Sequence, residues 1–193
     1  MSLSLLPNLL CVLRMVLAVP LVWTLIEGHF AWTLLIFLVA AATDGLDGFL
    51  AKRLHCETEL GKLLDPIADK LLLVSAFVAL TIIGLVPLWL TATAVARDLI
   101  IGGGAAVYRR LFGPLQGRPT WPSKINTVFQ LSYGLAVVAA AAAPALVPQA
   151  IVIALGATTF VTTVVSGADY VSLYARKAAA VSRSRATGAE LPK

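Results

Sequence analysis

The sequence predicts an all-α integral membrane protein with six transmembrane helices and both termini in the cytoplasm. Of its 193 residues, 59% are hydrophobic and only 13% are charged, whereas a soluble domain is about 45–50% apolar and about 25% charged. The mean hydropathy of +0.89 points the same way. Six spans of about 20 residues each would use almost all of the apolar residues. This composition excludes a soluble globular domain, a disordered chain and a secreted disulfide scaffold.

Six apolar segments follow one another, separated by glycine, proline and charged residues. Each is long enough to cross a hydrocarbon core of about 30 Å at about 1.5 Å per residue. In order, the expected spans are residues 8–26, 31–50, 62–85, 88–108, 125–143 and 148–174. We expect one transmembrane domain over residues 1–177, followed by a basic, disordered tail over residues 178–193 that lies near anionic headgroups.

The connections between these segments alternate in charge. Those around residues 27–30, 84–87 and 143–149 contain no Lys or Arg. The opposite set holds Lys52, Arg53, Lys62, Arg109, Arg110, Arg118, Lys124, Arg176, Lys177, Arg183, Arg185 and Lys193. By the positive-inside rule the basic side is cytoplasmic, so both termini lie there and the number of spans is even.

The net charge of +5 does not indicate a nucleic-acid partner. The basic residues lie in short blocks between apolar runs and form no continuous basic face, so we expect no nucleic-acid binding. They indicate membrane orientation instead. We expect an integral protein of a bacterial inner (cytoplasmic) membrane.

Four aspartates fall inside or at the ends of two apolar segments. They are Asp44, Asp47, Asp65 and Asp69. At the centre of a span each would cost about 2.5–3.5 kcal/mol, so other groups must compensate them. The first two are three residues apart and the last two are four apart, so each pair shares a helix face. The turn between the helices predicts antiparallel neighbours whose carboxylates meet at the cytoplasmic ends.

Two divalent cations would neutralise four carboxylates that otherwise repel one another. Oxygen ligands favour Mg²⁺ or Mn²⁺ over zinc, and two-metal carboxylate sites typically clamp a phosphate during an in-line displacement. The alternative is that the acids cap helix ends or pair with basic neighbours, which explains only one or two of them. These neighbours are Lys52, Arg53, Lys62 and Lys70. Gly48 and Gly61 either let a ligand approach the backbone or allow close helix packing.

This stretch resembles the signature of the CDP-alcohol phosphatidyltransferases, integral membrane enzymes that join two parts of a phospholipid with release of CMP. The family pattern is D-x-x-D-G-x-x-A-R, eight residues, then G-x-x-x-D-x-x-x-D. It falls here on Asp44, Asp47, Gly48, Ala51, Lys52, Gly61, Asp65 and Asp69. Lys52 stands where the family usually has Arg, and it offers the diphosphate a point charge in place of a bidentate fork. Arg53 is the alternative contact, although it points about 100° away on a helix.

The resemblance implies six transmembrane helices, a homodimer and two divalent cations held by the four aspartates. It also implies that Asp69 deprotonates the acceptor hydroxyl, which then attacks the β-phosphorus of a CDP-linked lipid. Residues 7–14 resemble the family segment P-N-x-x-T-x-x-R, with Cys11 in place of Thr. This likeness places Asn8 and Arg14 near the nucleotide. For Arg14, snorkelling to the membrane interface is the alternative.

Within the family, residues 96–98 and 118–127 are similar to CMP-forming cardiolipin synthases. That similarity implies CDP-diacylglycerol and phosphatidylglycerol as substrates in the membrane. Phosphatidylglycerophosphate synthases, which use glycerol 3-phosphate, share the core motif and are an alternative. A small cation-coupled transporter would also carry carboxylates in helices, but the chain lacks the inverted repeats expected of one.

Three further cations are candidate substrate contacts. Arg97 either meets phosphate or an aspartate in a polar cavity, or forms an internal pair with Asp98 or Asp169. Arg118 and Lys124 lie near the cytoplasmic surface and serve either the acceptor or anionic lipid. We expect the active site to face the cytoplasm.

Overall fold

The computed structural model describes the backbone of residues 5–54, 59–112 and 120–187, and the side chains of residues 11–43, 68–107, 110 and 120–176. Every described element is a helix, which confirms the all-α prediction. The helices are α1 (Leu5–Ile26), α2 (Phe30–Leu54), α3 (Glu59–Ile82), α4 (Leu88–Phe112), α5 (Trp121–Ala142) and α6 (Gln149–Thr187). Their order and approximate bounds follow the six predicted segments.

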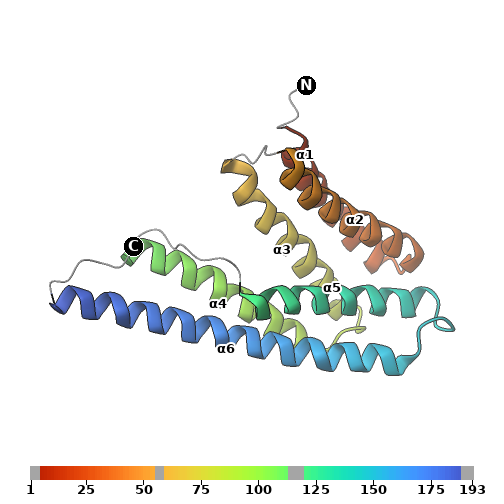
Figure 1. Cartoon of the computed structure of the whole chain (residues 1–193). Helices are drawn as coiled ribbons and strands as arrows, with labels where there is room; N and C mark the ends of the chain where they lie inside the picture. Colours follow the sequence, from red (N-terminus) through yellow and green to blue (C-terminus); the bar gives the residue numbers. More distant parts are fainter. Residues whose placement is uncertain (1–4, 55–58, 113–119, 188–193) are drawn as a thin grey trace.

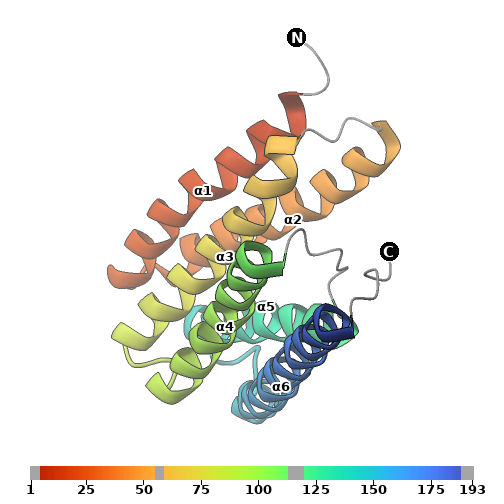
Figure 2. The ribbon, with the colours of Figure 1, turned by 90° about the vertical axis from the view of Figure 1, so that its left-hand side faces the viewer.

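The helices form two groups. In one, α1 packs against both α2 and α3, and in the other, α6 packs against both α4 and α5. Figures 1 and 2 show these groups inclined to each other, and contacts of α2 with α5 and of α3 with α4 and α5 join them. Helix α3 therefore lies where the two groups meet. Helix α1 is a common partner of α2 and α3. The predicted contact between the end of α2 and the start of α3 involves side chains outside the described ones and stays a prediction.

Two glycines allow short reversals of the chain. Gly28 follows α1 with φ 75°, and Gly84 follows α3 with φ 78°. Side chains other than glycine rarely adopt this left-handed backbone conformation, which closes helix C-termini. The amide of His29 donates to the carbonyl of Thr24 at 2.8 Å, and that of Leu85 to the carbonyl of Leu80 at 2.9 Å. Both connections therefore cap one helix and start the next within a few residues.

The apolar core lies toward these connections. Leu25, Leu80 and Leu90 are almost completely buried there, and the rings of Phe77 and Tyr133 pack at a centroid distance of 6.0 Å. Interhelical hydroxyl bonds accompany the core, because a hydroxyl among helices in hydrocarbon has no water to bind. The Thr33 hydroxyl donates to Thr24 Oγ1 at 2.9 Å, and the hydroxyls of Thr81 and Thr91 are 2.6 Å apart.

The outer surface is strongly apolar. Trp23, Leu88 and Trp121 are 66%, 70% and 77% exposed. Exposed apolar surface on this scale is unusual for a soluble monomer and fits a hydrocarbon surrounding. Within the described residues, three helical segments are long and apolar enough to span a membrane: Leu88–Val107, Trp121–Ala142 and Gln149–Arg176. In α1 and α2 the side chains are described only in part, and the apolar segments among them are Cys11–Ile26 and Phe30–Thr43.

Helix α6 is longer than predicted. It has 39 residues and continues to Thr187, whereas the sequence predicted a disordered tail from Ala178. Small residues and arginines dominate this stretch, and alanine and arginine are among the better helix formers. The helix therefore continues beyond its apolar part instead of ending there.

Candidate functional site

Polar side chains of α5 and α6 recur at helical spacing. They are Ser123, Asn126 and Gln130 in α5 and Thr159, Thr163 and Ser166 in α6. Residues three or four apart share one helix face, and all of these except Ser123 are buried. Because α5 and α6 pack together, the two polar faces form a seam inside an otherwise apolar pair of helices.

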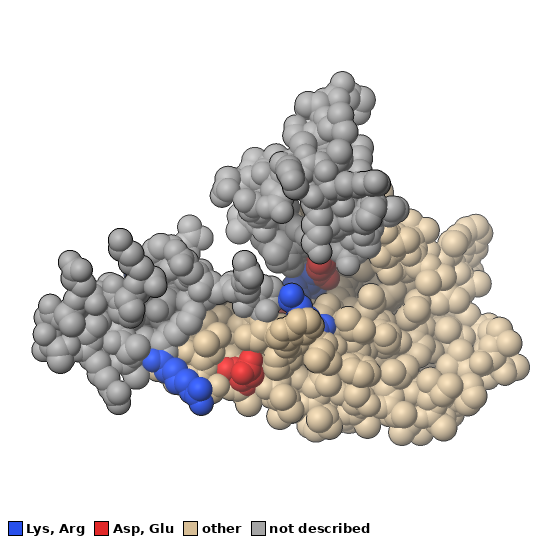
Figure 3. Space-filling view, viewed as in Figure 1, with Lys and Arg blue, Asp and Glu red and all other residues tan. Residues whose placement is uncertain are grey.

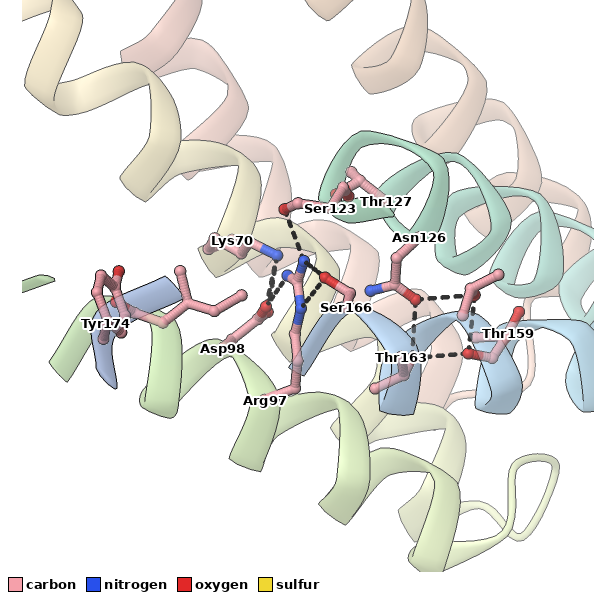
Figure 4. Close-up of polar contacts among 12 residues, drawn as sticks. Lys70, Arg97, Asp98, Ser123, Asn126, Thr127, Thr159, Thr163, Ser166 and Tyr174 are labelled. Atoms are coloured by element: carbon pink, nitrogen blue, oxygen red, sulfur yellow. Dashed lines mark hydrogen bonds and ion pairs between the residues drawn. The ribbon is translucent and has the colours of Figure 1, made fainter. Parts of the chain in front are cut away.

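Arg97 of α4 reaches into this seam and binds both helices (Figure 4). Its side chain is only 4% exposed. Nη2 donates to Ser123 Oγ at 2.6 Å and to Ser166 Oγ at 2.5 Å, and Nε donates to Ser166 Oγ at 3.2 Å. A guanidinium has five N–H donors in a planar fork, so it can hold several acceptors at once. One side chain thus joins α4, α5 and α6.

Asp98 connects Arg97 to α3. Nη1 of Arg97 donates to Asp98 Oδ1 at 2.7 Å, and Lys70 Nζ donates to Oδ1 and Oδ2 at 2.7 and 2.8 Å. Of the roles predicted for Arg97, the internal pair is therefore present. Among the described residues its partner is Asp98 and not Asp169. A continuous polar chain runs from α3 through α4 to α5 and α6 (Figure 4).

The seam also contains two buried amides. Asn126 Oδ1 accepts hydrogen bonds from Thr162 at 3.0 Å and from Thr163 at 2.8 Å. Within the described part of the chain, neither amide atom of Gln130 has a partner. Gln130 and Asp98 line the same small cavity, together with apolar side chains of α3 and α4. Polar groups thus continue from Asp98 into the interior of the protein.

Asp69, the predicted base, forms an ion pair with Arg14 of α1. The Arg14 side chain is 1% exposed and that of Asp69 is 40% exposed. Snorkelling of Arg14 to the interface is therefore wrong, because its guanidinium is buried and points to α3. The pair links α1 to the helix that carries two of the four predicted metal ligands.

Charged side chains of both signs gather where the two helix groups meet (Figure 3). The members of this cluster are Arg14, Asp69, Lys70, Arg97 and Asp98. Lys70 is 37% exposed, so within the cluster its exposure is close to that of Asp69. The described part of the site therefore presents one carboxylate, paired with Arg14, and one ammonium, paired with Asp98.

Most of the predicted ligand residues have side chains outside the described ones. They are Asn8, Asp44, Asp47, Gly48, Lys52, Arg53, Gly61, Asp65 and Arg118. The backbone places Asp44 and Asp47 in α2 and Asp65 and Asp69 in α3. That each pair shares a helix face stays a prediction from the spacing. Among the described side chains no metal-binding group is found, and of the four aspartates only Asp69 is among them. An all-oxygen set with an accessible Asp69 carboxylate fits divalent cations such as Mg²⁺ or Mn²⁺.

Lys124 lies at the surface near the start of α5. Its Nζ is 5.4 Å from the centroid of the Trp121 ring, a distance at which cation and ring attract each other. An exposed Trp and Lys at a helix end are typical of a membrane interface. Its predicted contact with an acceptor or an anionic lipid stays a prediction.

Comparison with known proteins identifies the family. The family model of the CDP-alcohol phosphatidyltransferases matches residues 4–166. The chain belongs to this family. The match includes both aspartate-bearing helices, Arg14 and the Lys70–Asp98–Arg97 chain, and it ends at Ser166. The predicted resemblance is thus confirmed, and CMP-forming cardiolipin synthases are among the relatives found.

The relatives include two kinds of enzyme. The human cardiolipin synthase (CMP-forming) is 35% identical over 72% of this chain and 50% of its own length, and that of Streptomyces coelicolor is 37% identical over 54% and 51%. A probable phosphatidylglycerophosphate synthase of Mycobacterium tuberculosis is 34% identical over 86% of this chain and 80% of its own length. The chain spans about half the length of the cardiolipin synthases that it matches.

The sequence alone does not single out Lys70, Ser123 and Ser166 as site residues. From the sequence, Lys70 is expected only as a partner that neutralises an aspartate. The available signal was the spacing of polar residues in α5 and α6, because recurrence every three or four residues predicts one polar face. The spacing within α5 and α6 does not show that Arg97 contacts this polar face, because Arg97 lies in a different helix.

The Arg97–Ser166 contact predicts a measurable coupling. Arg97→Lys and Ser166→Ala should each lower the midpoint of thermal unfolding in detergent, and the double variant should lose less than the sum. We expect a coupling free energy of about 0.5–2 kcal/mol, because a lysine cannot reproduce the fork and interhelical bonds in membrane proteins are modest. The control is Thr93→Val, which removes a half-buried α4 hydroxyl that donates to Trp89 of its own helix. Strict additivity would contradict the contact.

Proposed function

We propose that this protein is a CMP-forming cardiolipin synthase, which transfers the phosphatidyl group of CDP-diacylglycerol to phosphatidylglycerol. The observation that carries the proposal is the ion pair between Arg14 and Asp69. Asp69 is the last aspartate of the family signature and is followed directly by Lys70. The acceptor hydroxyl gives its proton to Asp69, its oxygen bonds to the β-phosphorus, and the bond to CMP breaks. The ion pair with Arg14 orients the Asp69 carboxylate, so the base is positioned before substrates bind.

The four aspartates Asp44, Asp47, Asp65 and Asp69 would hold two divalent cations, Mg²⁺ or Mn²⁺. When bound, such ions orient the diphosphate and stabilise the charge on the leaving phosphate. Lys52 or Arg53 would contact the same diphosphate, with Gly48 and Gly61 leaving room for it. Asn8 is proposed to lie near the nucleotide.

The supply of cations supports a lipid acceptor. Glycerol 3-phosphate is a small dianion, and a site for it should aim several basic groups at its phosphate. Among the described residues, Arg97 is used by Asp98 and two serines, and Arg14 faces Asp69. The phosphodiester of phosphatidylglycerol carries one negative charge and therefore needs fewer basic partners than the dianion does. Arg118 and Lys124 would lie near the headgroups of either acceptor.

Phosphatidylglycerophosphate synthesis is the second candidate. The Mycobacterium tuberculosis relative with that probable activity aligns with 86% of this chain and 80% of its own length, a more complete match than the cardiolipin synthases give. Both activities share the donor, the aspartates and the chemistry of displacement. They differ only in which hydroxyl is presented to Asp69.

We also propose six membrane spans, cytoplasmic termini and a homodimer, in a bacterial inner membrane with the active site toward the cytoplasm. The absence of Lys and Arg from the α1–α2, α3–α4 and α5–α6 connections and the basic opposite side support this orientation. The segment Gln149–Arg176 supports the last span. We propose that the charged cluster faces this basic side, from which a soluble CMP product would leave.

The proposed metal chemistry predicts sensitivity of all four aspartates. Asp44→Asn, Asp47→Asn, Asp65→Asn and Asp69→Asn should each reduce CMP release by more than about 100-fold, because each removes a charged ligand or the base. EDTA should abolish release, and added Mg²⁺ or Mn²⁺ should restore it. Asp169→Asn, at a carboxylate outside the proposed ligand set, is the control. Full turnover in metal-free enzyme would refute the metal proposal.

The acceptor is tested with purified enzyme and radiolabelled CDP-diacylglycerol. We expect cardiolipin when phosphatidylglycerol is supplied and little product with glycerol 3-phosphate, because few cations remain to bind a dianion. Products are separated by thin-layer chromatography. A rate with glycerol 3-phosphate equal to or above that with phosphatidylglycerol would favour the second candidate and leave the shared chemistry unchanged.

The orientation is tested with a single cysteine. In a variant with Cys11→Ala and Cys56→Ala, Gln149→Cys at the start of α6 should react with an impermeant thiol reagent in spheroplasts but not in inside-out vesicles. Arg176→Cys near the other end of the apolar segment should give the opposite result. Labelling of position 149 from the cytoplasm would overturn the orientation, because α6 would then run in the other direction.

A further inference from the structure

We infer that Lys70 binds a phosphate oxygen of a substrate and that Asp98 is the positioning residue that holds Lys70 for this contact. The inference rests on the proposed phosphatidyl transfer and extends it to a residue outside the predicted site. The phosphate belongs either to the CDP-linked donor or to the phosphodiester of the acceptor. Both present the same anionic oxygen.

Accessibility singles out Lys70 within the described charged cluster. The side chains of Arg14 and Arg97 are 1% and 4% exposed, so neither offers its charge to a ligand from outside. The side chain of Lys70 is 37% exposed, and that of its neighbour Asp69 is 40% exposed. A ligand that brings its hydroxyl to Asp69 therefore meets the ammonium of the next residue.

Lys70 shares its carboxylate partner with a second cation. Asp98 faces both Lys70 and Arg97, whereas Asp69 faces Arg14. The single negative charge of Asp98 does not neutralise both of its cationic partners, and unbalanced charge among apolar helices is costly. A phosphate oxygen bound at Lys70 supplies further negative charge to this pair of cations, and phosphate is the anion common to both substrates.

The ammonium of Lys70 has one hydrogen-bond donor left for a ligand. An ammonium has three donors, and two of its hydrogen bonds go to Asp98 Oδ1 and Oδ2 at 2.7 and 2.8 Å. Asp98 is itself fixed by Arg97, which is fixed by Ser123 and Ser166. The side-chain entropy of a long lysine is therefore already lost before a ligand arrives, which makes the contact stronger.

Helix geometry separates Lys70 from the predicted metal face. Successive residues of a helix are rotated by about 100°, whereas residues four apart lie almost in line. Asp65 and Asp69 thus share one face of α3, and Lys70 projects beside it toward α4, where Asp98 lies. The lysine does not compete with divalent cations for the carboxylates and is placed to approach a phosphate from another side.

The test compares Lys70→Met, which removes the charge but keeps most of the stem, with Lys70→Arg, which keeps the charge. KM for each lipid substrate is measured in mixed micelles with the other saturating, alongside kcat and the midpoint of thermal unfolding. Arg176→Met, at an exposed cation on α6, is the matched control. Binding of CDP-diacylglycerol is also measured without turnover, as its shift of the unfolding midpoint.

We expect Lys70→Met to raise KM for one substrate by about tenfold or more, because a charge-assisted bond is lost, while Lys70→Arg recovers most of it. A rise for CDP-diacylglycerol, with a smaller ligand-induced shift, assigns the donor phosphate, and a rise for the acceptor alone assigns the acceptor phosphate. Asp98→Asn should raise the same KM, with little further rise in the double variant with Lys70→Met, since it acts through Lys70.

KM values within twofold of the parent for both substrates, or a loss of stability alone, would overturn the inference. Equal loss in Lys70→Met and Lys70→Arg would also overturn it, because a phosphate contact requires the charge. Failure of the proposed function is recognised separately in the parent protein, as turnover with glycerol 3-phosphate in place of phosphatidylglycerol. In that case the same KM comparison is made with the acceptor that reacts.

Discussion

A charge surrounded by apolar helices must be compensated by other groups of the protein, and the arrangement of α3 to α6 depends on how Arg97 meets this requirement. Its guanidinium uses hydroxyls from α5 and α6 and the carboxylate of Asp98. Through Asp98 the same constraint extends to Lys70 of α3. Removing Arg97 would leave Asp98 and two buried polar surfaces without their common partner, so this residue fixes how the two helix groups meet.

The molecule therefore divides its stabilising interactions along its length. Toward the short connections that lack Lys and Arg, close packing of side chains such as Leu80 and Phe77 holds the helices together. Where the two helix groups meet, ion pairs and hydrogen bonds of Lys70, Arg97 and Asp98 join them. This second region suits charged, phosphate-bearing substrates, because there the helices already carry polar groups.

The sequence was sufficient for the helical class, the order of the helices and the aspartate motif, because hydropathy and fixed spacing are local properties. It was insufficient for partners that depend on packing. Arg97 could have met phosphate, Asp98 or Asp169, and only the approach of α5 and α6 decides between them. Likewise Arg14 was expected near the nucleotide or the interface, and its contact with Asp69 depends on how α1 lies on α3. The extension of α6 to Thr187 was missed because a basic, alanine-rich stretch is compatible with either helix or disorder.

The position of Arg97 in the chain also has a consequence for biosynthesis. A ribosome makes α4 before α5 and α6, so Arg97 is synthesised before Ser123 and Ser166. Asp98 is the next residue along the chain, and Lys70, which pairs with Asp98, is made earlier. The adjacent carboxylate is therefore the first acceptor that the chain supplies to Arg97, and the two serines follow with the last two helices. The acceptors of Arg97 are thus supplied in the order in which the chain is made.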